Sequence, residues 1–373
     1  MKYRIVTHGN CTDGYCSAFV VKKFFNTLFG TKLTEQEIQE IPVLGVQPQD
    51  IQAGKVPFSS ADVVVDLPKP DSKIFFWCDH HLTTKPTAAL PENQYWKAAP
   101  SCTGFLIAIA LEKGAKSSTE LVKFKKAIDI NDSAAYTKKD IKDCYYKRKS
   151  YQQQNSLQKL TMIGAMFNTR DRVLNDEIFR TLLSSELGET PLSSKSLWQL
   201  NPIMFYKAQL ESFELWRKNV DIYLRYDAEA QCVVQDDRKA NINIGVPDRF
   251  YSYLKFPQAS YHMNLRIIDE VLRNHKTISG TPEGGSPSVQ KGASSLAPKA
   301  LPSIEKKARL GIGSNIFHKE RCKVDISKLC QEVGKKFGGS GGGHFAVGGA
   351  VIKADKADEA IKFILEILRG KMQ

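Results

Sequence analysis

The sequence lacks any apolar run long enough to cross a membrane. Its longest apolar runs, Ile74–Cys78 and Phe105–Leu111, are far shorter than the roughly 20 residues that a membrane-spanning helix needs. The first residues, Met1–Val6, are typical of a strand and lack the apolar segment of a secretory signal. The sequence therefore predicts a cytoplasmic protein without a membrane partner.

Cysteine is also sparse and irregularly spaced. The chain of 373 residues has eight cysteines and no Cys-x-x-Cys pair, which is the spacing that structural zinc sites commonly use. In a chain of this length, eight scattered cysteines do not indicate a disulfide framework. We expect free thiols in a reducing compartment and no structural zinc.

Charge, in contrast, is abundant and unbalanced. The 53 Lys and Arg residues exceed the 40 Asp and Glu residues, which gives a net charge of +13, and 42% of the residues are hydrophobic, enough to bury a core. A basic excess favours an anionic partner such as a nucleic acid or a phosphorylated small molecule, but a basic solvated surface gives the same balance. The charge therefore supports an oligonucleotide or nucleotide substrate without defining the chemistry.

Short apolar runs alternate with helical patterns in the first part of the chain. The predicted strands are Arg4–Thr7, Ile41–Leu44, Val63–Val65 and Lys73–Cys78, and the predicted helices are Ser17–Phe29 and Ser101–Leu111. Strands separated by helices imply a parallel sheet that is covered on both faces. Chemistry in such folds lies outside the carboxyl ends of the strands.

The remaining chain predicts a second, smaller α/β domain. We expect residues 1–195 to form the first domain, 196–227 a helical connector, and 228–373 the second domain. Further strands are predicted at Cys232–Val234 and Asn241–Val246, then a helix start at Arg249–Leu254 and a closing helix at Ala357–Leu368. The segment 277–300 is rich in Gly, Ser and Pro, which predicts a flexible insertion.

Acidic residues and histidines follow three of the predicted strands. The segment His8–Gly14 follows the first strand, Asp66 follows Val63–Val65, and Asp79-His80-His81 follows the fourth strand. A single carboxylate at a strand end is more often a turn or cap residue than a ligand. Imidazoles and carboxylates that converge on one sheet edge, however, form a metal site of nitrogen and oxygen ligands.

These motifs resemble those of the DHH phosphoesterase superfamily, which includes RecJ-type exonucleases, short-oligonucleotide ribonucleases and cyclic-dinucleotide phosphodiesterases. His8 with Asp13-Gly14, Asp66, and Asp79-His80-His81 are similar to motifs I to III, and Ala127–Ala134 is similar to motif IV. The glycine-rich run Phe337–His344 resembles the motif of the DHH-associated C-terminal domain. The matches occur in the family's order over nearly the whole chain.

The resemblance implies a site for two divalent metal ions, Mn²⁺ first, with Mg²⁺ or Co²⁺ as alternatives. It assigns His8 to the first ion, Asp13 and His80 to the second, and Asp66 to both. Asp129 is expected to complete the ligands of the second ion, with Asp132 as the competing candidate in motif IV. Asp79 would bind a metal or orient the site, and His81 is the expected catalytic residue at the scissile phosphate.

Motif I departs from the RecJ-like pattern, because Asn10 stands where a carboxylate is usual and Asp13 comes five residues after His8. We therefore expect the first ion to use Asn10 or Cys11, or to bind more weakly. In the C-terminal domain, the resemblance assigns substrate binding to the loop residues Gly341, Gly342, Gly343 and His344. Their backbone N–H groups would form an anion-binding nest.

The resemblance predicts a manganese-dependent phosphodiesterase that hydrolyses short oligonucleotides or single-stranded nucleic acid ends by a two-metal mechanism. The first domain would be catalytic, the second would bind substrate, and the active site would lie in the cleft between them; a homodimer is compatible with this. The alternatives are a cyclic-dinucleotide phosphodiesterase, a 3′-phosphoadenosine 5′-phosphate phosphatase, and a non-catalytic nucleic-acid-binding protein with a decayed metal site.

Overall fold

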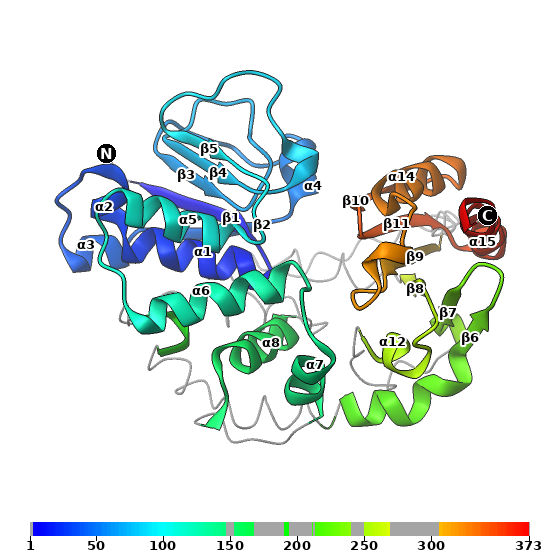
Figure 1. The fold of residues 1–373 in the computed structure, drawn as a ribbon. Coiled ribbons are helices and arrows are strands. Elements are labelled where there is room, and N and C mark those ends of the chain that lie inside the picture. Colours follow the sequence, from blue (N-terminus) through cyan, green and yellow to red (C-terminus); the bar gives the residue numbers. More distant parts are fainter. Residues whose placement is uncertain are drawn as a thin grey trace, which may run out of the picture. The chain divides into compact units, whose positions relative to one another are not determined.

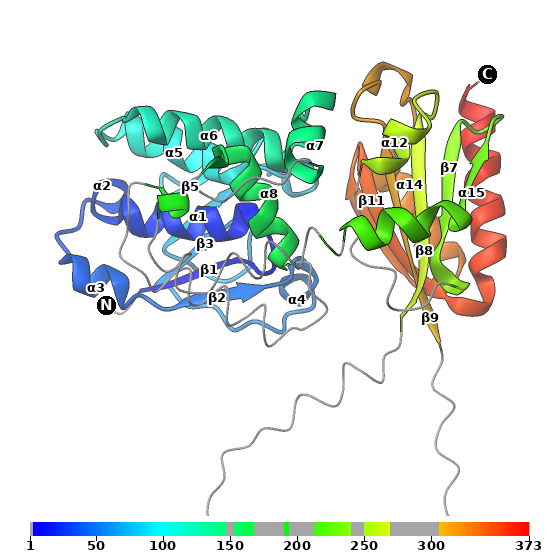
Figure 2. The ribbon, with the colours of Figure 1, turned by 90° about the horizontal axis from the view of Figure 1, so that it is seen from below.

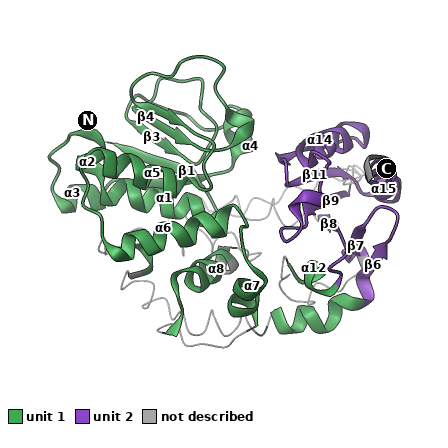
Figure 3. Cartoon of the chain, viewed as in Figure 1, with its two compact units in different colours: residues 1–221, 242–255 green, residues 222–241, 256–373 purple. Residues whose placement is uncertain are grey.

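The computed structural model describes residues 3–146, 153–167, 190–193, 211, 213–239, 250–268 and 306–372. The chain divides into two compact units: unit 1 is residues 1–221 with 242–255, and unit 2 is residues 222–241 with 256–373 (Figure 3). The expected insertion 277–300, the expected strand Asn241–Val246 and residues 196–210 of the expected connector lie outside the described residues. The domain boundaries derived from the sequence stay a prediction.

The sheet of unit 1 is parallel, with the strand order β2-β1-β3-β4-β5. Its strands are β1 (Arg4–His8), β2 (Val43–Val46), β3 (Asp62–Val65), β4 (Phe76–Asp79) and β5 (Gln94–Trp96). The central run Val63–Val65 is completely buried, as a β-branched strand covered on both faces requires. The expected parallel sheet is confirmed, and β5 is a strand that the sequence pattern did not predict.

Helices cover one face of this sheet. Both α1 (Thr12–Lys23) and α5 (Cys102–Glu112) lie against the strands, and α6 (Thr119–Asp132) packs beyond α5 (Figures 1 and 2). The opposite face carries an apolar cluster that includes Val6, Val64 and Trp77. The remaining elements of the unit are α2 (Phe25–Phe29), α3 (Glu35–Gln39), α4 (Pro48–Gln52), η1 (Leu82–Thr84), α7 (Lys138–Tyr145), α8 (Ser156–Phe167), η3 (Pro191–Ser193) and α12 (Tyr251–Lys255), with η4 (Asp221–Tyr223) at the boundary between the units.

The predicted helix Ser17–Phe29 differs from the structure at both its start and its middle. The helix begins earlier, at Thr12, and is interrupted at Phe24, whose φ of −111° and ψ of 22° are not helical. The predicted helix Ser101–Leu111 corresponds to α5, where the side chain of Ser101 accepts a hydrogen bond from the backbone N–H of Gly104 and caps the helix.

Unit 2 contains a mixed sheet with the strand order β10-β11-β9-β8-β7-β6, in which β7 and β8 are parallel and the other neighbours antiparallel. The strands are β6 (Leu224–Asp227), β7 (Cys232–Asp236), β8 (Tyr261–Ile268), β9 (Lys307–Ser314), β10 (Ser340–His344) and β11 (Val347–Lys353). The helices α14 (Ile326–Lys336) and α15 (Ala357–Met372) share one apolar core with these strands. Three single turns complete the unit: η5 (Asp237–Lys239), η6 (Lys319–Arg321) and η7 (Ala354–Lys356).

The cysteines and the helices bear on two expectations from composition, free thiols and no membrane-spanning segment. All eight cysteines are free thiols, and seven of them are buried. Among the described residues, no helix combines the length and the apolar character needed to cross a membrane.

Candidate metal centre

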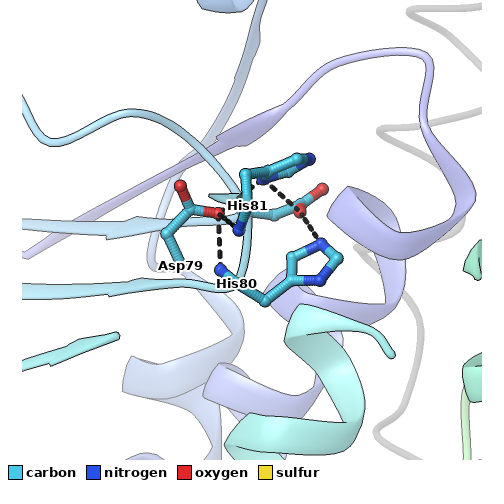
Figure 4. A group of neighbouring side chains, drawn as sticks. Asp79, His80 and His81 are labelled. Carbon is cyan, nitrogen blue, oxygen red and sulfur yellow. Dashed lines mark hydrogen bonds and ion pairs between the residues drawn. The ribbon is translucent and has the colours of Figure 1, made fainter. Parts of the chain in front are cut away.

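The carboxyl edge of the unit 1 sheet gathers most of the predicted site residues. His8 ends β1, Asp66 follows β3, and Asp79 ends β4, directly before His80 and His81. Because β1, β3 and β4 are consecutive in the sheet, their ends bring these side chains together at the edge where parallel α/β folds bind ligands. Figure 4 shows the carboxylate of Asp79 facing the backbone nitrogen of His80 and the ring of His81.

Asp66 lies at the centre of this cluster and is only 1% exposed. Its φ of 57° is left-handed, a conformation that Asp tolerates better than most residues. Its Oδ1 lies 3.4 Å from His80 Nε2, and its Oδ2 lies 3.6 Å from His8 Nδ1. Neither carboxylate oxygen has a hydrogen-bond partner among the described residues, and His80 Nε2 also lacks one.

Asp13 is held in the first turn of α1 by the N-terminus of α5. Its carboxylate accepts hydrogen bonds from the backbone N–H groups of Cys102 at 2.7 Å and Thr103 at 3.1 Å. The following residue is Gly14 because a Cβ there would collide with the backbone oxygen of His8. The Asp13-Gly14 pair in the sequence therefore reflects the close approach of α1 to the end of β1.

His80 is oriented towards three carboxylates. Its Nδ1 lies 2.9 Å from the backbone oxygen of Ala99, so that this nitrogen carries the proton and Nε2 faces the cluster. Nε2 lies 3.4 Å from Asp66, 3.5 Å from Asp132 and 3.7 Å from Asp13.

The motif IV residue that lies in the cluster is Asp132, and not Asp129, which the sequence analysis favoured. Asp132, at the end of α6, joins Asp13 and His80, and their ligand atoms lie within 4.8 Å of one another. Asp129 instead accepts hydrogen bonds from Ser101 Oγ at 2.6 Å and from Lys125 Nζ at 2.7 Å. Asp129 thus connects α5 to α6, and Asp132 takes the place in the cluster that the sequence analysis gave to Asp129.

Asp79 is fully buried and orients its neighbours. Its Oδ1 accepts a hydrogen bond from the backbone N–H of His80 at 2.8 Å and lies 2.6 Å from His81 Nδ1. Its Oδ2 accepts a hydrogen bond from Thr84 Oγ1 at 2.6 Å. Of the two roles that the resemblance left open for Asp79, these contacts favour orientation.

The charges in the cluster shift its pKa values strongly. Burial and the charge of Asp66 raise the pKa of Asp13 to about 6. Burial and the charges of Asp13 and Asp66 also raise the pKa of Asp132. Burial alone would lower the pKa of His80, but Asp66, Asp13 and Asp132 raise it to about 11. Burial alone would raise the pKa of Asp66, but its histidine partners lower it.

The donor set fits divalent cations. The close ligand atoms form three overlapping groups, which are His8, Cys11 and Asp66; Asp13, His80 and Asp132; and Asp66, Asp79, His80 and His81. The buried, unpartnered oxygens of Asp66 and Nε2 of His80 are the groups that a cation would satisfy. Of the two candidates proposed for the altered motif I, Cys11 lies in the cluster, whereas the side chain of Asn10 is exposed and its φ is 57°.

The glycine-rich run in unit 2 is a strand and not the loop that the sequence predicts. Gly341, Gly342, Gly343 and His344 belong to the strand β10, which lies at the edge of the sheet and pairs, among the described strands, with β11 alone. A Cβ on Gly341 would collide with the backbone oxygen of Cys330 in α14. Close packing of α14 on β10 therefore accounts for glycine at this position.

Three residues that contact the centre were not predicted: Thr84, Trp96 and Ala99. Ala99 contributes only its backbone oxygen, and Trp96 donates from Nε1 to the backbone oxygen of His81 at 2.9 Å. No sequence pattern could have indicated the contacts of Ala99 and Trp96, because Ala99 acts through its main chain and Trp96 comes from the unpredicted strand β5.

Comparison with known proteins gives one family and several related folds. Residues 303–370 match the family model of the DHHA1 domain. The pGpG-specific phosphodiesterase PggH from Vibrio cholerae has a TM-score of 0.63 at 18% identity, covering 99% of this chain and 100% of PggH. The exonuclease RecJ bound to manganese has a TM-score of 0.52 at 11% identity, covering 100% of this chain and 91% of RecJ. No curated protein matches the sequence.

At these identities the similarity to PggH and RecJ is one of fold. The chain therefore has the fold of PggH and RecJ, and its residues 303–370 match the DHHA1 domain. This confirms the α/β fold class and the DHH-associated C-terminal domain that the sequence predicts.

Proposed function

We propose that this chain is a metal-dependent phosphodiesterase that hydrolyses short oligonucleotides. The observation that carries the proposal is the cluster of buried carboxylates and imidazoles at the carboxyl edge of the unit 1 sheet, with Asp66 unpartnered at its centre. The similar fold of PggH, a pGpG-specific phosphodiesterase, makes linear dinucleotides the first substrate class to test. The net charge of +13 also favours an anionic substrate.

In this proposal, His8, Cys11 and Asp66 hold one divalent cation, and Asp66 with Asp13, His80 and Asp132 holds a second. We propose Mn²⁺ as the preferred ion. Two bound cations would activate water and polarise the phosphate.

In this proposal His81 is the general acid that protonates the leaving oxygen. Burial alone would lower the pKa of His81, but its hydrogen bond to Asp79 and the charge of Asp66 raise it, which favours the protonated ring at neutral pH. The Asp79 contact keeps a proton on Nδ1, so that His81 donates through Nε2 to the leaving oxygen of the ester.

Unit 2 would hold the substrate through β10. In an edge strand every second residue directs its N–H and C=O groups away from the neighbouring strand. The residues Gly341–Gly343 add no side chain of their own beside these groups, and a Cβ on Gly342 would meet open space. We propose that these N–H groups and His344 bind phosphate oxygens of the oligonucleotide.

Hydrolysis of pGpG by the purified chain, stripped of metal and resupplied with Mn²⁺, tests this function. We expect Mn²⁺-dependent release of mononucleotide, and a loss of at least about 100-fold in Asp66→Asn, because even partners that only orient metal ligands contribute about 10- to 100-fold. The control is Asp71→Asn, which changes an exposed carboxylate between β3 and β4.

Parallel reactions with longer RNA, cyclic di-GMP and 3′-phosphoadenosine 5′-phosphate define the substrate. Preference for either of the last two would replace the proposal with the corresponding alternative activity. Tight RNA binding without bound metal and without hydrolysis of any substrate would identify a non-catalytic binding protein.

A further inference from the structure

The turn η1 holds the carboxylate that orients His81. Thr84 Oγ1 lies 2.6 Å from Asp79 Oδ2 and 2.9 Å from the backbone oxygen of His81. The backbone N–H of Thr84 donates to the same His81 oxygen at 3.2 Å. Thr84 therefore restrains both the carboxylate that binds the His81 ring and the main chain that carries the ring.

Trp96 restrains the same main chain from β5. Its Nε1 donates to the backbone oxygen of His81 at 2.9 Å, and in the register of the sheet Trp96 pairs with Asp79. The indole packs against the apolar cluster that includes Val64 and Trp77, so that its N–H has a fixed position. Because the His81 oxygen accepts hydrogen bonds from both Trp96 and Thr84, the backbone at His81 has little freedom to rotate.

We propose that Thr84 is a positioning residue of the phosphodiesterase site, acting through Asp79 on His81, with Trp96 as a second support. The inference rests on the proposed function. Asp79 is completely buried, and among the described residues Thr84 is the hydrogen-bond donor to its Oδ2. Without that donor the buried oxygen loses its partner and the carboxylate is free to turn. The contact from Oδ1 to His81 Nδ1 then no longer fixes the ring.

We expect the consequence to fall on the chemical step and not on substrate or metal binding, because Thr84 binds Asp79 Oδ2 and the His81 main chain. Neither is a proposed ligand of an ion or of the substrate, and the His80 N–H binds the other oxygen of Asp79, Oδ1. Thr84→Val keeps the shape of the side chain and removes the hydroxyl. We expect kcat to fall about 10- to 100-fold, with KM and metal content unchanged. Thr84→Ser restores the hydroxyl and should recover most of kcat. The matched control is Thr83→Val, an exposed threonine of the same turn, which should behave as the wild type.

Trp96→Phe is an independent test, and it replaces the first if Thr84→Val does not fold, as judged by circular dichroism. It keeps an aromatic ring in the cluster and removes the N–H, so that we expect a smaller fall in kcat at unchanged KM. Wild-type kcat in both Thr84→Val and Trp96→Phe would overturn the inference. Failure of Thr84→Ser to recover activity would also overturn it.

A spectroscopic measurement separates this inference from the proposed function, because it needs no turnover. The His81 Nδ1 proton bound to Asp79 should give a downfield proton NMR resonance in the metal-free and Mg²⁺-loaded chain, assigned by its absence in His81→Gln. We expect the resonance in wild type and Thr83→Val and its broadening in Thr84→Val. An unchanged resonance in Thr84→Val contradicts the positioning role alone, whereas a wild type inactive on every phosphodiester contradicts the proposed function alone.

Discussion

At the scale of single residues, the candidate site depends on which side chains already have partners. Asp129 and Asp132 lie one turn apart on α6, but the carboxylate of Asp129 is bound by Ser101 and Lys125. Asp132 has no such partner in α5 and instead lies 3.5 Å from His80. Sequence spacing could not separate the two, because one of the two donors to Asp129 is Ser101, which lies 28 residues earlier in the chain at the N-terminus of α5.

Substitution of each motif IV aspartate should separate metal binding from stability. We expect Asp132→Asn to lose bound Mn²⁺ and at least about 100-fold of activity, because a ligand matters at least as much as its orienting partners. We expect Asp129→Asn to keep both, but to lower the free energy of unfolding by about 1–3 kcal/mol, because Ser101 and Lys125 lose a charged acceptor. Metal analysis and urea denaturation measure the two effects. Loss of metal in Asp129→Asn alone would restore the original assignment.

At the scale of elements, the sequence predicts buried strands better than edge strands. The continuous apolar run at β3 could be recognised because both of its faces are buried. The strand β5 has only three half-buried residues, too few for a periodic signal. Glycine is disfavoured in strands, so that β10 looked like a loop; the packing of α14 that requires glycine at Gly341 is a tertiary contact.

Adjacent glycines of β10 provide a test of this packing. In Gly341→Ala the new Cβ meets the backbone oxygen of Cys330, and we expect the free energy of unfolding of unit 2 to fall by about 1–3 kcal/mol, the usual cost of overpacking. In Gly342→Ala the Cβ meets open space, and the change should stay within about 0.5 kcal/mol. Urea denaturation of the two variants gives both values. Equal destabilisation would show that α14 does not pack closely on β10.

At the scale of the whole molecule, the candidate metal ligands and the residues that match the DHHA1 domain belong to different compact units. Every group of candidate metal ligands found among the described residues lies in unit 1. Unit 2 has its own core, formed by its sheet with α14 and α15. A cation that binds these ligands therefore stabilises unit 1 by mass action. The described residues of unit 2 contain no group of candidate ligands through which it would stabilise that core.

Thermal unfolding with and without Mn²⁺ should show this division. All four tryptophans lie within residues 1–221, so that tryptophan fluorescence reports unit 1 while calorimetry reports both units. At a free Mn²⁺ concentration of about 100 times Kd, each site should add about 2.7 kcal/mol to the stability of unit 1. We expect Mn²⁺ to raise the unfolding temperature of the fluorescence transition and to leave the transition of unit 2 in place.

The size of this metal-dependent shift should also depend on pH. In the metal-free site His80, whose pKa is about 11, is protonated, and Asp13, whose pKa is about 6, is protonated in a fraction of the molecules. A cation must displace these protons, so that its Kd falls and the shift grows from pH 6 to pH 8. Asp66→Asn is the control, because it removes the carboxylate common to both proposed ion sites and should abolish the shift at each pH. A Mn²⁺ shift that is equal in both units, or that survives in Asp66→Asn, would place the cation elsewhere in the chain.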